Sequence, residues 1–81
     1  MMKIKTLFFG ITTDLVGSSE LEIELAENTS IKEFKFNLKD QFPELTNINS
    51  YAIAVNETYA NNDDVLKEND VVAVIPPVSG G

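Results

Sequence analysis

The sequence has 81 residues, and thirteen acidic residues against six lysines give it a formal net charge of −7 at pH 7. Because cysteine, histidine and arginine are absent, disulfides, a thiolate nucleophile, a zinc–thiolate site and the commonest general base are excluded. The negative charge opposes nucleic-acid binding and favours a partner with a basic surface.

The length and the hydrophobic content of 43% indicate one small folded domain over residues 1–81. No apolar run approaches the roughly 20 residues of a membrane span, and the first three residues do not open the apolar region of a signal peptide. We therefore expect a cytoplasmic protein that binds no membrane, no nucleic acid, no metal and no cofactor of its own.

Two strands are predicted before the main helix. Residues 2–9 alternate, with Ile4, Thr6 and Phe8 on one face. Residues 10–17 form a connector between two glycines, with room for one helical turn. Residues 18–25 form the second strand, and their alternating glutamates predict a charged outer face at a sheet edge.

Residues 29–42 are predicted to form the main helix. Ser30 and Glu33 have capping-box spacing, or Thr29 is the cap with the box shifted by one. Pro43 ends the helix. The core stripe comprises Ile31, Phe34, Leu38 and Phe42. Lys32, Lys35 and Lys39 share one flank and are interpreted as surface lysines. Phe36 falls outside the core stripe, and the pattern assigns it no role.

The second half is predicted to contain three more strands. Residues 44–50 are a polar loop, and residues 51–55 a strand with Tyr51, Ile53 and Val55 pointing inward. Residues 56–57 make a tight turn into a short strand at 58–60. After a turn-rich loop at 61–64, residues 65–66 pack back onto the core. Residues 71–75 are apolar on both faces, which predicts a central strand parallel to the first.

One helix covering one face of this sheet leaves the other face bare. The side chains predicted for that face are Leu7, Phe9, Ala52, Ala54, Tyr59, Ala73 and Ile75. An uncovered apolar patch of this kind indicates a partner site.

The last six residues have the features of a tethered arm. Pro76 and Pro77 stop sheet pairing and hold the exit extended, and no charged side chain follows. Six residues reach on the order of 20 Å. Gly80 and Gly81 lack Cβ atoms, so they can pass a constriction and leave the terminal carbonyl open to attack. The alternative is an inert end of small residues.

Three segments carry a resemblance to a known family. They are Leu-Phe-Phe-Gly at 7–10 with Asp-Leu-Val-Gly at 14–17, Ala-Val-Asn-Glu-Thr-Tyr at 54–59, and residues 70–81 with their Pro-Pro-Val-Ser-Gly-Gly end. Together they resemble the small subunits of molybdopterin synthase, which are ubiquitin-like sulfur carriers. Two departures are Asn69, where the family usually has glycine, and Thr12-Thr13, where it often has a basic residue.

The resemblance implies an α+β fold of the ubiquitin-like β-grasp type, with a mixed sheet of four to five strands, one main helix on one face and a flexible tail over 76–81. It also implies a chemistry. An ATP-dependent adenylyltransferase resembling ubiquitin-activating enzymes would activate the Gly81 carboxylate, and a persulfide route would convert it to a thiocarboxylate.

In this family the thiocarboxylate sulfur goes to cyclic pyranopterin monophosphate, and two rounds build the molybdopterin dithiolene of the molybdenum cofactor. By resemblance, Gly81 is the carrier end, Gly80 gives access, and the catalytic side chains lie in the large subunit. The same resemblance places Phe9, Tyr59, Ile75, Pro76, Pro77, Val78 and Ser79 against that subunit, in a heterotetramer of two small and two large chains.

Three alternatives stay open at this point. The chain could carry sulfur for the thiamine thiazole or another metabolite. It could be a protein modifier whose Gly81 forms isopeptide bonds with lysines. It could also be an interaction domain with an inert tail.

Overall fold

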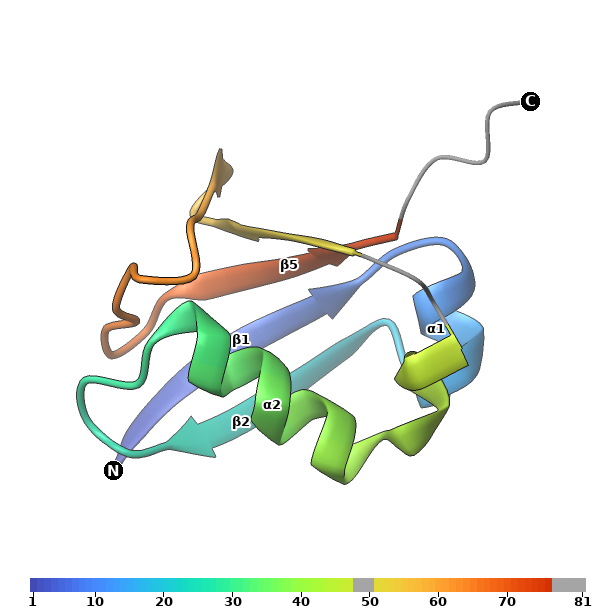
Figure 1. Cartoon of the computed structure of the whole chain (residues 1–81), viewed down its shortest axis with the longest axis horizontal. Helices are drawn as coiled ribbons and strands as arrows, with labels where there is room; N and C mark the ends of the chain where they lie inside the picture. The colour runs from blue at the N-terminus through green and yellow to red at the C-terminus, as the bar shows by residue number, and fades with distance from the viewer. Residues whose placement is uncertain (48–50, 77–81) are drawn as a thin grey trace.

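The computed structural model describes residues 1–47 and 51–76. Within these residues a five-stranded sheet has the order β2-β1-β5-β3-β4. Its strands are β1 (Met2–Phe8), β2 (Glu20–Leu25), β3 (Ala52–Val55), β4 (Thr58–Tyr59) and β5 (Val71–Ile75). β5 is parallel to β1 and antiparallel to β3. The final strand is therefore central, as its apolar sequence predicts (Figure 1).

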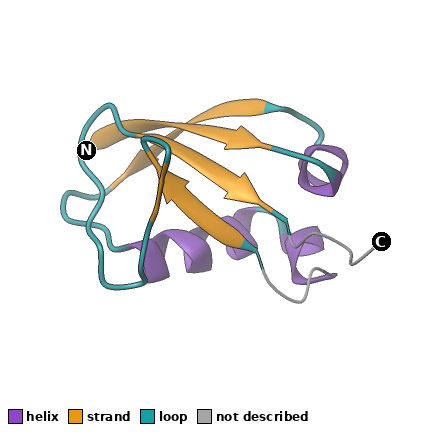
Figure 2. Cartoon of the chain, turned by 90° about the horizontal axis from the view of Figure 1, so that it is seen from above, coloured by secondary structure: helices purple, strands orange, loops and turns teal. Residues whose placement is uncertain are grey.

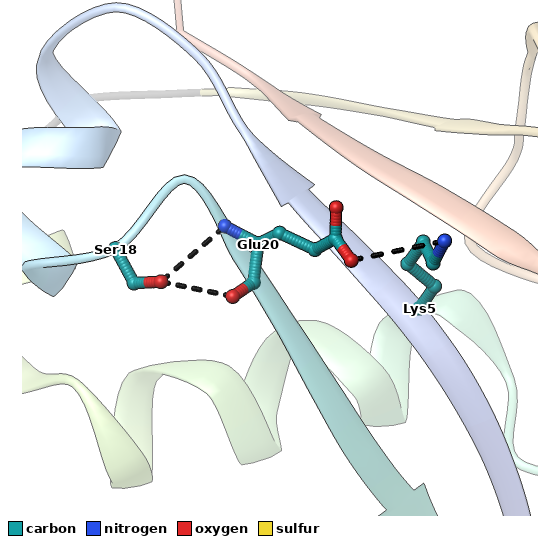
Figure 3. Close-up of polar contacts among 3 residues, drawn as sticks. All are labelled: Lys5, Ser18 and Glu20. Atoms are coloured by element: carbon teal, nitrogen blue, oxygen red, sulfur yellow. Dashed lines mark hydrogen bonds and ion pairs between the residues drawn. The ribbon is translucent and has the colours of Figure 1, made fainter.

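β1 and β2 show the predicted alternation. The even-numbered residues from Met2 to Phe8 are buried, and Lys3 and Lys5 are exposed. Phe9, predicted to end the first strand, instead enters the following turn. At the start of the β2 edge strand, the Ser18 hydroxyl bonds the backbone of Glu20, and the Glu20 carboxylate lies 3.7 Å from the Lys5 ammonium (Figure 3). This ion pair is half-exposed and contributes little stability.

The helix α2 (Ile31–Gln41) lies across one face of the sheet, so strands and helices form two layers (Figure 2). Ser30 is its cap: the hydroxyl accepts from the Glu33 N–H, and the Glu33 carboxylate accepts from the Ser30 N–H. The helix therefore starts two residues later than predicted, since Thr29 instead donates to the Ala26 carbonyl. The predicted stripe is buried at Ile31, Phe34 and Leu38, and the half-buried Phe42 ring meets Phe8 edge-on.

The prediction of a plain polar loop after the helix is wrong. Pro43–Asn47 forms a 3₁₀ helix, η1, and Leu45 within it is fully buried in the core. Leu45 follows Phe42 at helical spacing, but Pro43 ends the predicted helix between them, so the sequence pattern did not assign Leu45 to the core. Residues 48–50 lie outside the described residues.

Two turns depend on asparagines. Asn56 and Glu57 both have positive φ, +50° and +72°, which joins β3 to β4 by the tight hairpin predicted. Asn69 has φ +70°, so it adopts the left-handed conformation that Asn tolerates in place of glycine. The mixed sheet and its single main helix confirm the expected β-grasp arrangement. No helix of residues 1–47 or 51–76 is long and apolar enough to cross a membrane.

Candidate functional site: the bare sheet face and the exit of β5

The register of the sheet places the predicted apolar patch on one face. Leu7 pairs with Ala73, Ala73 with Ala54, and Ala54 with Tyr59, so these four residues form one row across β1, β5, β3 and β4. Ala52 pairs with Ile75 in the next row on the same face. Since α2 packs against the opposite face, the main helix leaves this surface uncovered, as predicted. We call it the apolar face.

Large side chains stand at the ends of this face and small ones occupy its middle. Phe9 and Tyr59 are 48% and 71% exposed, and Ile75 is half-buried. Ala54 was expected to point outward to solvent, yet it is only 6% exposed because a methyl group between two neighbouring strands scarcely rises above the backbone. The face therefore offers the exposed Tyr59 ring and a strip of small side chains to a partner, and the exposed Phe9 lies in the turn that follows β1.

At one end of the apolar face, the exit of β5 meets the turn between β1 and α1 (Ile11–Val16). Gly10 in that turn has φ +57° and ψ −136°, close to the first central position of a type II′ turn, which favours glycine. The Thr12 N–H closes the turn by donating to the Phe9 carbonyl at 3.2 Å. A Cβ at Gly10 would lie 3.1 Å from Cγ of Pro76. The absence of a side chain at Gly10 thus makes room for the first residue of the tail.

Two threonine hydroxyls hold this turn. The Thr12 hydroxyl donates to the Phe9 carbonyl and accepts from the Phe9 N–H, and the Thr13 hydroxyl donates to the Phe8 carbonyl. Thr12 is fully buried. Sequence reasoning assigned these residues no structural role; the available signal was their position two and three residues after the glycine that follows the first strand, where threonine hydroxyls commonly bond the backbone.

Of the predicted site residues, the structure brings Phe9, Ile75 and Pro76 together around the exit of β5, and it places Tyr59 farther along the apolar face on β4. Pro77, Val78, Ser79, Gly80 and Gly81 lie outside the described residues. Within residues 1–47 and 51–76, no cluster of three or more acidic side chains is arranged to hold a metal ion. What the described site offers is contact surface rather than acid–base groups.

Comparison with known proteins gives a consistent result over the whole chain. The pattern of the ThiS family matches residues 6–81. The chain is 39% identical, over all of both sequences, to the molybdopterin synthase sulfur carrier subunit of Caenorhabditis elegans.

Solved structures agree with these sequence matches. A Pyrococcus furiosus protein described as molybdopterin converting factor subunit 1 superposes with a TM-score of 0.89 at 31% identity, over 96% of this chain and 100% of that one. In a complex of subunits 1 and 2 of the molybdopterin-converting factor from Helicobacter pylori, the matching chain is 27% identical with a TM-score of 0.69, over 99% of this chain and 100% of that one. The small archaeal modifier protein 1 of Haloferax volcanii has a TM-score of 0.86 but 15% identity, over 96% and 100% of the two chains, and shows the fold alone.

Proposed function

Because this chain belongs to the family of molybdopterin synthase sulfur carrier subunits, we propose that it carries sulfur as a thiocarboxylate on Gly81 and donates it to cyclic pyranopterin monophosphate. The product would be the dithiolene of molybdopterin. The family match extends to residue 81, which supports the Gly-Gly end as the working end.

The carboxylate itself must first be activated. With a pKa of about 3.3–3.7 it is ionised at neutral pH and is a poor electrophile. An adenylyltransferase resembling ubiquitin-activating enzymes would join it to AMP from ATP and release pyrophosphate. The terminal sulfur of a cysteine persulfide would then displace AMP to give an acyl disulfide. A second thiol would break its S–S bond, which releases the thiocarboxylate and leaves a disulfide between the two thiols. ATP is used by that enzyme and is not held by this chain. Because these steps use ATP and persulfide sulfur, we propose the cytoplasm as the compartment.

The single observation that carries the proposal is the position of the apolar face. Ile75 lies on that face and directly precedes Pro76, whose ring packs against Gly10. A partner that covers the face therefore lies beside the root of the tail and can receive its end. We propose that this partner is the large subunit, with Phe9, Tyr59 and Ile75 at the contact and Pro76 to Ser79 leading into its active site. The Helicobacter pylori complex of two subunits supports such a pairing.

The complete assembly is proposed to be a heterotetramer of two small and two large chains. This chain would supply the sulfur-bearing end, and the large subunit would supply the catalytic side chains. The absence of cysteine, histidine and arginine from the sequence agrees with that division of labour.

The intact mass of the protein, isolated with its partners, tests the proposal directly. We expect a species heavier by one sulfur-for-oxygen exchange, with the change mapped to Gly81 by fragmentation. Incubating that species with large subunit and cyclic pyranopterin monophosphate should return the unmodified mass and yield molybdopterin. A ladder of lysine conjugates would instead support the protein-modifier function, and release of sulfur to a thiazole precursor would support the thiamine function.

Two variants separate the carrier end from the docking face. Deleting Gly80 and Gly81 should abolish molybdopterin formation while the domain stays folded and still binds the large subunit. Phe9→Glu should weaken large-subunit binding by placing a charge in an apolar contact, with little effect on folding because Phe9 is 48% exposed. Molybdopterin formation by the deletion variant, or unchanged affinity of Phe9→Glu in a titration, would contradict the proposal.

A further inference from the structure

A second exposed aromatic surface lies on α2, on the opposite side of the molecule from the apolar face. Lys32, Lys35, Phe36 and Lys39 follow the spacing i, i+3, i+4 and i+7, which places them in one stripe along the helix. This stripe is separate from the buried one formed by Ile31, Phe34 and Leu38. Phe36 is 74% exposed, so it contributes almost nothing to the core, and its helix propensity is lower than that of alanine. Folding therefore gives no reason for a phenylalanine here.

The loop before β5 turns this stripe into a groove. The Lys32 N–H donates to the Asn62 carbonyl at 3.1 Å, and the Lys35 ammonium donates to the Asn62 side-chain oxygen at 3.1 Å. Asn62 thereby forms a second wall beside the helix. The groove has a volume of about 540 Å³ and is lined by the stripe together with Glu33 and Asn62. Lys35 is partly buried, and its ammonium group is hydrogen-bonded to Asn62. The groove is therefore present in the structure of the chain alone.

The charge of the groove is opposite to that of the rest of the chain. It holds three of the six lysines in a protein of net charge −7. Within the described residues the recorded ion pair is Lys5–Glu20, which lies away from the groove on the sheet edge. The one carboxylate in the lining, Glu33, accepts hydrogen bonds from the Ser30 N–H and hydroxyl. The three lysines therefore surround an exposed aromatic ring with positive charge, and the Lys35 ammonium bonds the neutral amide oxygen of Asn62 rather than a carboxylate.

We propose that this groove is a second docking site, which binds an acidic protein segment carrying one apolar anchor side chain. Carboxylates of the segment would pair with the lysines, and its anchor would cover the Phe36 ring. Because the groove and the apolar face lie on opposite sides of the sheet, both can be occupied at once. A partner bound here need not leave when the apolar face is covered.

The test is a titration of the full chain, labelled for NMR, with a synthetic peptide of glutamates around one central leucine. We expect shifts confined to residues 32–39 and Asn62, and affinity that falls as salt is added. Replacing the central leucine by serine in the peptide, or Phe36 by alanine in the protein, should each weaken binding by about tenfold, equivalent to about 1.4 kcal/mol. Phe36→Leu should restore most of the loss, because it keeps an apolar side chain at that position.

The controls distinguish this site from general attraction to lysine. Lys35→Gln should weaken binding by about two- to fivefold and reduce the salt dependence, whereas Lys67→Gln, which removes the same charge away from the groove, should change neither. Equal effects of the two lysine variants, or unchanged affinity in Phe36→Ala, would overturn the proposal. So would tighter binding of a single-stranded oligonucleotide or inorganic phosphate at the same residues, since either would indicate an anion site rather than a peptide site. Phe36 is exposed, so every variant should remain folded.

Discussion

Replacing Gly10 by alanine tests whether the turn after β1 sets the root of the tail. An L-residue at φ +57° and ψ −136° stores backbone strain of about 1–3 kcal/mol. The new Cβ would also lie 3.1 Å from Cγ of Pro76, a contact tighter than normal van der Waals separation, and overpacking of this kind costs about 1–3 kcal/mol. We expect a total destabilisation of about 2–6 kcal/mol.

This loss is large for a domain of 81 residues, whose free energy of unfolding is expected to be about 4–12 kcal/mol. Urea unfolding followed by circular dichroism measures this destabilisation. We expect a lower midpoint urea concentration and an unchanged dependence of the unfolding free energy on urea concentration. Gly17→Ala is the matched control. Gly17 also has positive φ, +86°, but an added Cβ there would meet no atom within 4 Å. Its cost should be confined to strain, about 1–2 kcal/mol.

A double-mutant cycle isolates the contact with the tail. In a Pro76→Ala background the ring atom is gone, so Gly10→Ala should destabilise the domain only through its backbone strain. The coupling energy between the two positions should therefore exceed about 0.5 kcal/mol. Additive effects of the two substitutions would refute the contact. A cost of Gly10→Ala no larger than that of Gly17→Ala would refute the assigned geometry of the turn.

Four further substitutions test individual elements. Leu45→Ala should destabilise the domain by about 2–5 kcal/mol because Leu45 is fully buried; a loss below about 1 kcal/mol in urea would contradict its place in the core. Ser30→Ala should cost about 1 kcal/mol by removing the cap, and Glu33→Gln should cost less because the amide oxygen can still accept. Burial raises the pKa of the Tyr51 hydroxyl, so ionisation favours the unfolded chain, and stability should fall as the pH rises above about 10. Tyr51→Phe should remove that component and cost little at neutral pH, since the buried hydroxyl has no hydrogen-bond partner among residues 1–47 and 51–76; an unchanged alkaline profile would contradict the assignment.

Patterns that depend on near neighbours were readable from the sequence. The capping box, the buried helix stripe and the edge strand with its glutamates all rest on residues a few positions apart, and each is confirmed. The central place of β5 was also predictable, because a strand that is apolar on both faces is typical of the middle of a sheet rather than of its edge. The order of the elements, with a helical crossover between β1 and β5, then favoured their parallel pairing.

Features that depend on distant residues required the tertiary structure. Leu45 lies beyond Pro43, which ends the predicted helix, and only the tertiary structure shows that η1 carries it into the core. The bare face was expected, but only the register showed Leu7, Ala73, Ala54 and Tyr59 in one row.

The same holds for the two contacts on which the site arguments rest. Gly10 and Pro76 are 66 positions apart in the sequence, and Lys35 and Asn62, whose side chains are hydrogen-bonded, are 27 positions apart. Local propensity contains no information about such pairs, because they form only when the strands and the helix have taken their places. The sequence by itself therefore determined most of the elements, and the tertiary structure decided which surfaces lie around the exit of β5 and beside α2.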